Sequence, residues 1–224
     1  VLLADRVLAA LHRHLLARGV AVRRGRAASV DEARAALRLE DGTILSADLL
    51  VVAAGPWAPR LLPALRGRVV PSRQVLVYLA PPPDLAEQWA RMPMLLDLSA
   101  GGGFYAVPPV AGTALKVGDH RFSRRGDPDD PREATAQEAA EILALTRTRL
   151  ERADAYRPIG ARACYYDVSE DENFVLEALG PATLVMSGFS GHGFKFAPTL
   201  GLAVAEAARD PSRRAAIAAW AAGN

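Results

Sequence analysis

The sequence predicts a mixed α/β fold that combines a parallel sheet with a second, mostly antiparallel sheet. Two apolar patterns predict this class. Residues 47–55 form a continuous apolar run that ends in small side chains, which is typical of a strand buried on both faces of a parallel sheet. Residues 68–79 alternate between apolar and polar side chains, as a half-buried strand does. A length of 224 residues allows one large domain or two modest ones.

At the amino terminus, leucine and valine at helical spacing predict a helix over 1–18, with Gly19 as its stop. Val1 stands where a methionine is expected, and the helix begins at once, so we expect a further amino-terminal part ahead of it. The pair Asp41-Gly42 lies between two strand-like stretches and predicts a hairpin turn. Ligands of parallel sheets bind at the carboxyl ends of strands, so at Ala53-Ala54-Gly55 the main chain can approach a cofactor.

Farther along, the prolines at 81–83 close the alternating strand, and the polar, proline-rich stretch 126–132 predicts a surface loop. The chain then ends with an apolar strand, a glycine-rich turn and an alanine-rich helix. In all, we predict helices at 1–18, 134–152 and 197–209, and strands at 20–24, 35–39, 43–45, 47–55, 68–79, 104–107, 114–117, 162–166 and 183–187.

Composition narrows the class of protein. Half of the residues are hydrophobic, 23% are charged and the net charge is +2. A disordered chain would have fewer apolar residues, and a nucleic-acid-binding protein would normally be more basic. Apolar stretches are interrupted within about ten residues, short of the roughly twenty that span a bilayer. We therefore expect a cytoplasmic globular protein that contacts neither nucleic acid nor membrane.

The turn at 188–195 carries glycines, a histidine and a lysine between the last strand and the last helix. Such a turn exposes backbone N–H groups at the positive end of the helix dipole, where an anion is stabilised. Its spacing fits neither G-x-S-x-G, since His192 is in fifth place, nor G-x-G-x-x-G, since Phe196 is in sixth place. Lys195 opposes the helix dipole, which a bound anion would explain. The alternative is that Lys195 points into solvent and His192 packs in the core.

Two more segments carry reactive side chains. Lys116 and His120 are four residues apart in a strand-like segment and so share a face. A lysine among apolar residues is costly to bury without a partner or a task, and an exposed lysine on an edge strand is the alternative. Cys164 is the only cysteine, so no internal disulfide can form. Arg162 nearby favours its thiolate, but inert packing is the usual state of an isolated cysteine. With four scattered histidines, the chain offers no zinc cluster.

Together these segments resemble the monomeric sarcosine oxidase and N-methyltryptophan oxidase family of flavin-dependent amine oxidases, within the D-amino-acid oxidase-like superfamily. The resemblance extends from about Val1 to Asp210. The matching segments are the turn SGFSGHGFKF at 187–196, the cysteine segment CYYDVSEDENF at 164–174, Phe104-Tyr105 followed by Lys116-Val-Gly-Asp-His120, VVAAGPW at 51–57 and SRQV at 72–75. They occur in the order that the family has.

The resemblance implies how FAD is held. Cys164 is implied to be joined covalently to the 8α position of the flavin. The other implied FAD contacts are Ala54, Gly55, Trp57, Gly188, Phe189, Gly191, Gly193 and Lys195.

It also implies the residues of the reaction. Lys116 would stand near the flavin N5 and help dioxygen accept electrons, and His120 and His192 would be further catalytic residues on the substrate and flavin face. Lys195 would bind the substrate carboxylate. Tyr105 and Tyr166 would form an aromatic wall around the amine.

For the domains, the resemblance implies that 1–62 and 179–224 belong to the FAD-binding domain and that 63–178 forms an inserted substrate domain. The family's G-x-G-x-x-G unit and its carboxylate-binding arginine are expected ahead of Val1, so we expect residues 1–224 alone to bind FAD poorly and to be inactive. The complete protein is implied to be a monomer that oxidises a secondary or N-methyl amino acid to an imine and reduces dioxygen to hydrogen peroxide. The alternatives are an FAD-dependent dehydrogenase with another electron acceptor and a non-catalytic truncated relic.

Overall fold

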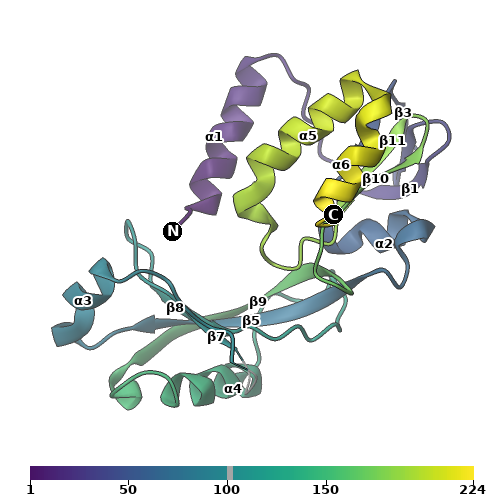
Figure 1. Cartoon of the computed structure of the whole chain (residues 1–224). Helices are drawn as coiled ribbons and strands as arrows, with labels where there is room; N and C mark the ends of the chain where they lie inside the picture. The colour runs from purple at the N-terminus through teal and green to yellow at the C-terminus, as the bar shows by residue number, and fades with distance from the viewer. Residues whose placement is uncertain (100–102) are drawn as a thin grey trace. The chain divides into compact units, whose positions relative to one another are not determined.

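Three sheets build the described part of the protein, and they belong to two units. The computed structural model describes residues 1–99 and 103–224. The antiparallel unit comprises Ser72–Tyr165, and the mixed-sheet unit comprises Leu2–Pro71 and Tyr166–Asn224 (Figure 1). The mixed α/β class predicted from the sequence is confirmed, whereas the domain limits after residues 62 and 178 stay predictions.

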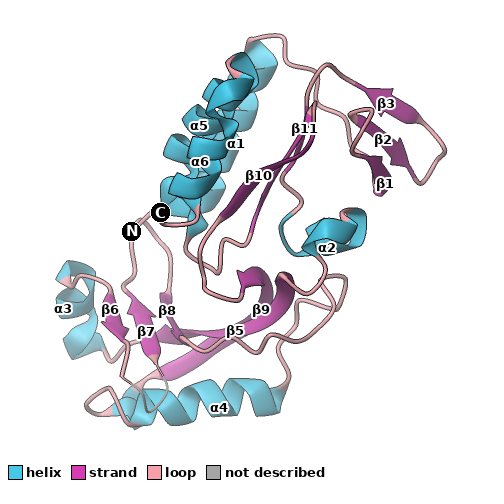
Figure 2. Ribbon diagram, turned by 45° about the vertical axis from the view of Figure 1, so that its right-hand side comes forward, coloured by secondary structure: helices cyan, strands magenta, loops and turns pink. Residues whose placement is uncertain are grey.

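The antiparallel unit is organised around a five-stranded sheet in the order β6-β7-β8-β5-β9. β6 pairs with β7, β7 with β8 and β8 with β5, each antiparallel. Figure 2 shows the longer helix, α4, along one face of the sheet. The elements are β5 (Val69–Ala80), α3 (Ala86–Arg91), β6 (Leu95–Asp97), β7 (Phe104–Val107), β8 (Leu115–Asp119), α4 (Ala136–Arg147) and β9 (Arg157–Ser169). The first residues of β5 and the last of β9 belong to the mixed-sheet unit.

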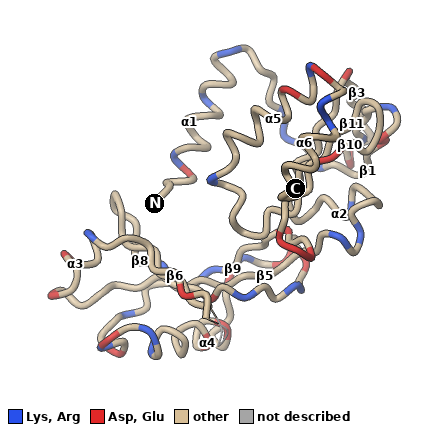
Figure 3. The backbone as a smooth tube through the Cα atoms, in the orientation of Figure 1, with Lys and Arg blue, Asp and Glu red and all other residues tan. Residues whose placement is uncertain are grey.

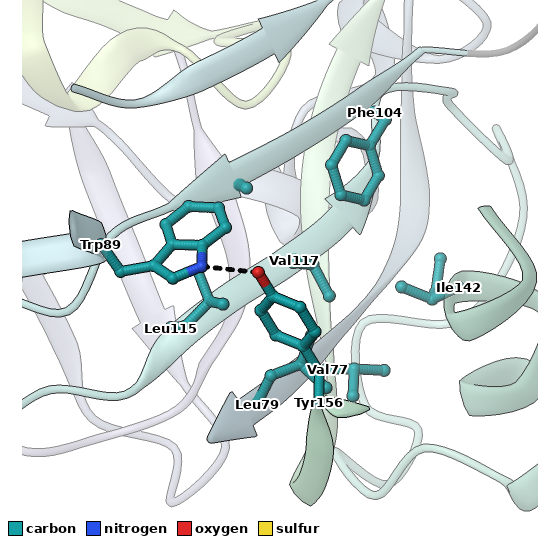
Figure 4. Packing of buried hydrophobic residues seen from close by; sticks show 9 residues of the cluster. Val77, Leu79, Trp89, Phe104, Leu115, Val117, Ile142 and Tyr156 are labelled. Atoms are coloured by element: carbon teal, nitrogen blue, oxygen red, sulfur yellow. Dashed lines mark hydrogen bonds between the residues drawn. The ribbon is translucent and has the colours of Figure 1, made fainter. Parts of the chain in front are cut away.

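Alternation along these strands gives the sheet one apolar face. Its buried side chains, which pack with Ile142 of α4, are Val77, Leu79, Phe104, Ala106, Leu115 and Val117 (Figure 4). At one end of this core the Trp89 indole N–H donates to the Tyr156 hydroxyl at 2.8 Å, and the two rings meet edge to face. Because successive side chains of a strand point to opposite faces, Tyr105 and Lys116 lie on the face away from α4.

An ion pair joins β5 to the start of α4. The Thr135 hydroxyl accepts from the Glu138 N–H at 3.1 Å, and the Glu138 carboxylate accepts from the Thr135 N–H at 2.8 Å, which forms a capping box. The Arg73 guanidinium donates to both Glu138 carboxylate oxygens, at 2.7 and 3.2 Å. These hydrogen bonds, above all those from Arg73, lower the pKa of Glu138 from 4.5 to about 2.

We expect Glu138→Gln to lower the unfolding free energy by about 1–3 kcal/mol near neutral pH, because hydrogen bonds to charged groups contribute about that much. A carboxyl group with a depressed folded-state pKa stabilises the fold above its unfolded pKa, and this contribution is lost as the pH falls toward the folded value. The deficit of the variant should therefore shrink between pH 4.5 and pH 2. Urea unfolding followed by circular dichroism at about pH 7 and about pH 3 measures it.

The matched control for this prediction is Glu87→Gln, which removes the exposed ion pair between Glu87 and Arg91 of α3. Exposed pairs contribute at most about 1 kcal/mol, so this variant should unfold almost like the wild type. A Glu138→Gln deficit that is equally large at both pH values would contradict the assignment.

The mixed-sheet unit contains two three-stranded sheets, with the orders β1-β2-β3 and β10-β11-β4. In the second sheet β10 and β11 pair antiparallel, whereas β11 and β4 pair parallel. The elements are α1 (Ala4–Ala17), β1 (Ala27–Asp31), β2 (Ala36–Leu39), β3 (Ile44–Ser46), β4 (Leu50–Val52), α2 (Ala58–Leu61), β10 (Val175–Gly180), β11 (Thr183–Ser187), α5 (Ala197–Arg209) and α6 (Arg214–Ala221). Short 3-10 helices occupy Gly55–Trp57, Pro63–Leu65, Pro83–Leu85, Ala153–Ala155, Gly193–Phe196 and Pro211–Arg213.

Helices α5 and α6 cover one face of the β10-β11-β4 sheet (Figure 2). On that face Leu184 of β11 packs with Leu200 of α5 and Ile217 of α6. The next residue of β11, Val185, points to the other face and packs with Ala58 and Leu62 around α2. The middle strand β11 is therefore buried on both sides, which holds its carboxyl end in place.

Local signals predicted many of these elements. The helix at 1–18 is α1, although none of its residues is buried, and the hairpin at Asp41-Gly42 joins β2 to β3. The helix at 197–209 is α5 with the same limits. The helix at 134–152 is shorter than predicted, because α4 ends at Arg147. The elements that were not predicted are β1, β6, β10, α2, α3 and α6.

Two of the predicted strands are wrong in whole or in part. Residues 20–24 form no strand, and Val20 and Val22 are exposed, since no strand of the described structure pairs with this segment. The run at 47–55 contains only the short strand β4, in which Val52 is buried and Leu50 and Val51 are half-buried. The strand is shorter than predicted, but it pairs parallel with β11 and is packed on both faces, with Val51 in the cluster of α5 and α6 and with Leu50 and Val52 in the cluster around α2.

Acidic and basic residues are interspersed over the elements of both units (Figure 3), in keeping with the net charge of +2. Among the described helices, none combines the length and the apolar character that crossing a membrane requires.

Candidate functional site

Parallel pairing of β4 with β11 brings two predicted cofactor segments to one edge of a sheet. Leu50 is the register partner of Thr183, and Val52 is the register partner of Val185. The two strands therefore end side by side, and residues 53–57 and 188–193 leave the sheet at the same edge. Carboxyl ends of parallel strands are where such sheets bind ligands. Ala54, Gly55 and Trp57 are thus brought together with the glycine-rich turn.

The main chain is open to approach at Gly55 on this edge. Gly55 has a φ of +52°, which favours glycine, and a Cβ added there would meet no atom within 4 Å. In the turn, Gly188 and Gly191 also have positive φ, at +70° and +77°. At Gly55 no neighbouring side chain covers the backbone, which fits a cofactor that packs flat against the main chain there.

Two predicted aromatic residues pack against the same turn. A Cβ at Gly191 would overlap the ring of Tyr166, and a Cβ at Gly193 would lie 2.6 Å from the ring of Phe189. Glycine is required at both positions because these rings lie directly on the backbone. Tyr166 and Phe189 therefore pack against the turn, and the aromatic wall around an amine that the resemblance implied for Tyr166 stays a prediction.

Sequence reasoning missed Asp167, which holds the beginning of the turn. Its buried carboxylate accepts from the Ser187 hydroxyl at 3.1 Å. Its backbone carbonyl accepts from the Ser190 N–H at 2.9 Å. The Ser190 N–H is therefore used internally, and the expectation that N–H groups of the turn stabilise an external anion stays a prediction. An acidic residue amid the aromatic and apolar side chains at 163–168 was the available signal.

Burial raises the pKa of Asp167 above its ordinary value, and the hydrogen bonds that it accepts act in the opposite direction. A carboxylate in such a place needs these donors, because an ionised group loses its hydration when it is buried.

His192 and Lys195 line one cavity of about 420 Å³ in the mixed-sheet unit, together with Phe174, Phe196, Leu200 and Trp220. His192 is half-buried, its Nδ1 lies 3.0 Å from the Ser190 carbonyl oxygen, and its ring centroid lies 5.2 Å from that of Phe174. Lys195 is exposed, with its ammonium 5.1 Å from the Phe196 ring centroid. The alternative that Lys195 points into solvent holds for its exposed ammonium. That ammonium nevertheless lies at a cavity with aromatic walls.

In the antiparallel unit, Lys116 and Tyr105 lie on neighbouring strands. The Lys116 ammonium is 5.9 Å from the centroid of the Tyr105 ring, which is within the range of a cation–π contact. The Tyr105 ring lies over Gly118, its register partner, where an added Cβ would come within 2.6 Å of the ring. Lys116 is half-buried on β8, an interior strand between β7 and β5, so the alternative of an edge-strand lysine is wrong.

His120 lies just beyond the end of β8 and is exposed. Its N–H donates to the Gly103 carbonyl at 2.9 Å, and its ring lies 6.1 Å from the Phe122 ring. Its catalytic role stays a prediction.

Cys164 is a half-buried free thiol on β9. Burial raises the pKa of this thiol above its ordinary value of 9.0, while the positive charges of Lys116 and Arg132 lower it. Cys164 and Lys116 were predicted from separate motifs, and both lie in the antiparallel unit. There the charge of Lys116 lowers the pKa of the Cys164 thiol. Among the described residues, no group of three or more His, Cys, Asp or Glu side chains could hold a metal ion.

Comparison with protein families supplies the context for this geometry. The family model described as "FAD dependent oxidoreductase" (DAO) matches residues 2–207. N-methyl-L-tryptophan oxidase of Salmonella typhi is 33% identical over 156 residues, which cover 67% of this chain and 41% of the relative. Monomeric sarcosine oxidase of a Bacillus species (strain NS-129) is 31% identical over 171 residues, which cover 73% of this chain and 44% of the relative. The chain thus spans less than half the length of these relatives.

Solved structures share the fold at lower sequence identity. The crystal structure of fructosyl amine:oxygen oxidoreductase (amadoriase I) from Aspergillus fumigatus superposes with a TM-score of 0.66 at 21% identity and covers 82% of this chain and 45% of that one. Amadoriase II from the same organism gives a TM-score of 0.66 at 18% identity.

Proposed function

Since this chain belongs to the family of FAD dependent oxidoreductases, as a distant homologue of N-methyltryptophan oxidase and monomeric sarcosine oxidase, we propose that the complete protein is an amine oxidase. It oxidises a secondary or N-methyl amino acid to an imine, and dioxygen takes up the two electrons and two protons as hydrogen peroxide. Water then hydrolyses the imine.

One observation carries this proposal: on the five-stranded sheet, the positive charge of a lysine ammonium lowers the pKa of a free thiol. Lys116 lowers the pKa of Cys164 against the effect of burial, and its ammonium lies over the Tyr105 ring. In the proposed enzyme Cys164 attaches the flavin covalently, and Lys116 supplies a fixed positive charge where dioxygen is reduced.

FAD is proposed to bind at the edge formed by 53–57 and 188–193, because two parallel strands end there side by side and the backbone at Gly55 is not covered by a neighbouring side chain. When bound, FAD supplies the acceptor for a hydride equivalent from the amine and the electrons for dioxygen. The protein's own groups contribute binding, orientation and charge.

Lys195 and His192 are proposed to hold the substrate. The exposed ammonium of Lys195 pairs with the substrate carboxylate, and the aromatic cavity that it shares with His192 takes the apolar part of the amine. Tyr166, which packs on Gly191, orients the turn that carries them.

Peroxide yield tests the proposal. The complete protein is purified, its flavin content is measured, and sarcosine, N-methyltryptophan and cyclic imino acids are supplied in air. We expect at least one of them to give one hydrogen peroxide for each amine oxidised. Amine oxidation that reduces a dye but yields no peroxide would establish the dehydrogenase instead, and a flavin-loaded protein that oxidises no amine would favour the relic.

A further inference from the structure

Asp167 is a buried carboxylate without a part in the proposed reaction, and it holds the strand end from which the site's turn begins. Its side chain is 6% exposed. It lies on β9, twenty residues before the β11 end that it contacts, and it accepts from the Ser187 hydroxyl at 3.1 Å.

We propose that Asp167 is a positioning residue of the cofactor site: its carboxylate accepts from Ser187 and its backbone carbonyl accepts from Ser190, and together they fix the start of the glycine-rich turn and so how residues 191–195 are presented. The inference rests on the proposed function, because it assumes that this turn contacts FAD and substrate.

The geometry of the turn shows why an internal anchor is needed. Ser190 has a φ of +47°, a left-handed conformation that is uncommon for a non-glycine residue and costs free energy. Its N–H donates to the Asp167 carbonyl, and its hydroxyl lies 3.2 Å from the Gly188 carbonyl and donates to it. Asp167 thus holds the turn through its main chain and its side chain together.

Loss of the carboxylate should release the first half of the turn. In Asp167→Asn the side chain keeps one oxygen but loses its negative charge and its second acceptor oxygen, so its hydrogen bond with the Ser187 hydroxyl is weakened. The main-chain bond from Ser190 remains, so the strand stays attached while the turn loses its defined start. We therefore expect the effect mainly on binding of FAD and less on folding.

The experiment measures reversible FAD binding in the complete protein. Cys164→Ser is used as the background, so that FAD is free to dissociate, and the dissociation constant is taken from quenching of flavin fluorescence. Asp167→Asn is expected to raise it at least tenfold, which corresponds to about 1.4 kcal/mol. Ser187→Ala, which removes one donor and keeps the carboxylate, is expected to raise it about two- to threefold.

Thr183→Val is the matched control. Thr183 is fully buried at the other end of β11, and its hydroxyl donates to the Glu32 carbonyl at 2.8 Å. The variant removes a buried hydrogen bond from the same strand without touching the turn. Its FAD affinity should equal that of the background, even where its unfolding free energy is lower.

The outcomes separate the inference from the proposed function. Unchanged FAD affinity in Asp167→Asn, or an equal loss in Thr183→Val, would overturn the positioning role. If Asp167→Asn does not fold, Ser187→Ala decides, and wild-type affinity in that variant would overturn it as well. A complete protein without any FAD binding would refute the proposed function together with the inference.

Discussion

Cys164→Ser is expected to abolish covalent attachment of the flavin in the complete protein. A thioether requires sulfur, and Cys164 is the only cysteine in these 224 residues. Serine is nearly isosteric but remains protonated, so it cannot replace the thiolate as a nucleophile. The measurement is flavin fluorescence that survives denaturation and gel electrophoresis: the wild type should keep it and the variant should lose it entirely.

The pH dependence of attachment follows from the surroundings of the thiol. Burial raises the pKa of Cys164 above 9.0, so the thiolate is a minor species near neutral pH. Attachment should therefore accelerate as the pH rises toward that value. The charge of Lys116 acts in the opposite direction, so Lys116→Met should slow attachment further.

Tyr165→Phe is the control for this prediction. It changes the residue next to the cysteine and removes the hydroxyl that bonds Asp130 and Arg73, but it keeps the sulfur. It should retain the flavin label. Label that persists in Cys164→Ser would show that attachment, if any, uses another residue.

Lys116→Met is expected to slow reoxidation of the reduced enzyme by dioxygen on the order of 10²–10³-fold, the usual loss when one preorganised charge or donor is removed. The ammonium is half-buried on an interior strand beside Tyr105, so solvent screens its charge less than that of a surface lysine. Methionine has a similar length and no charge. Reduction by the amine should change much less.

Stopped-flow measurement of the two half-reactions tests this prediction. Lys195→Met is the matched variant, because it removes an ammonium at the other predicted position and should weaken substrate binding while reoxidation stays fast. Equal slowing of both half-reactions in Lys116→Met would contradict the assignment, since it would indicate a general disturbance of the site.

Several parts of the site were predictable because their signals are local. The turn at 188–193 is indicated in the sequence by glycines between a strand and a helix. The structure shows positive φ at Gly188 and Gly191. Lys116 stood out as a charge among apolar residues of a strand. Neither signal depends on a distant part of the chain, so both survive in the sequence alone.

Other parts could not be predicted from neighbouring residues. The role of Asp167 depends on partners about twenty residues away, at the end of β11. That Lys116 is on an interior strand follows from the order β7-β8-β5, in which segments far apart in the sequence become neighbours. The failed strand at 20–24 had the right alternation but no partner strand in the described structure.

By itself, the sequence determined which of the longest elements are helices and which are strands, and where the glycine-rich turn lies. It also determined that the reactive residues belong to motifs of one family. These depend on side-chain periodicity and on backbone preferences that each residue carries with it. Only the tertiary structure decided which strands are central, which loops share the edge beyond β4 and β11, and which carboxylate anchors the turn. Pairing and burial decide these features, and both are set by residues that meet only when the chain is folded.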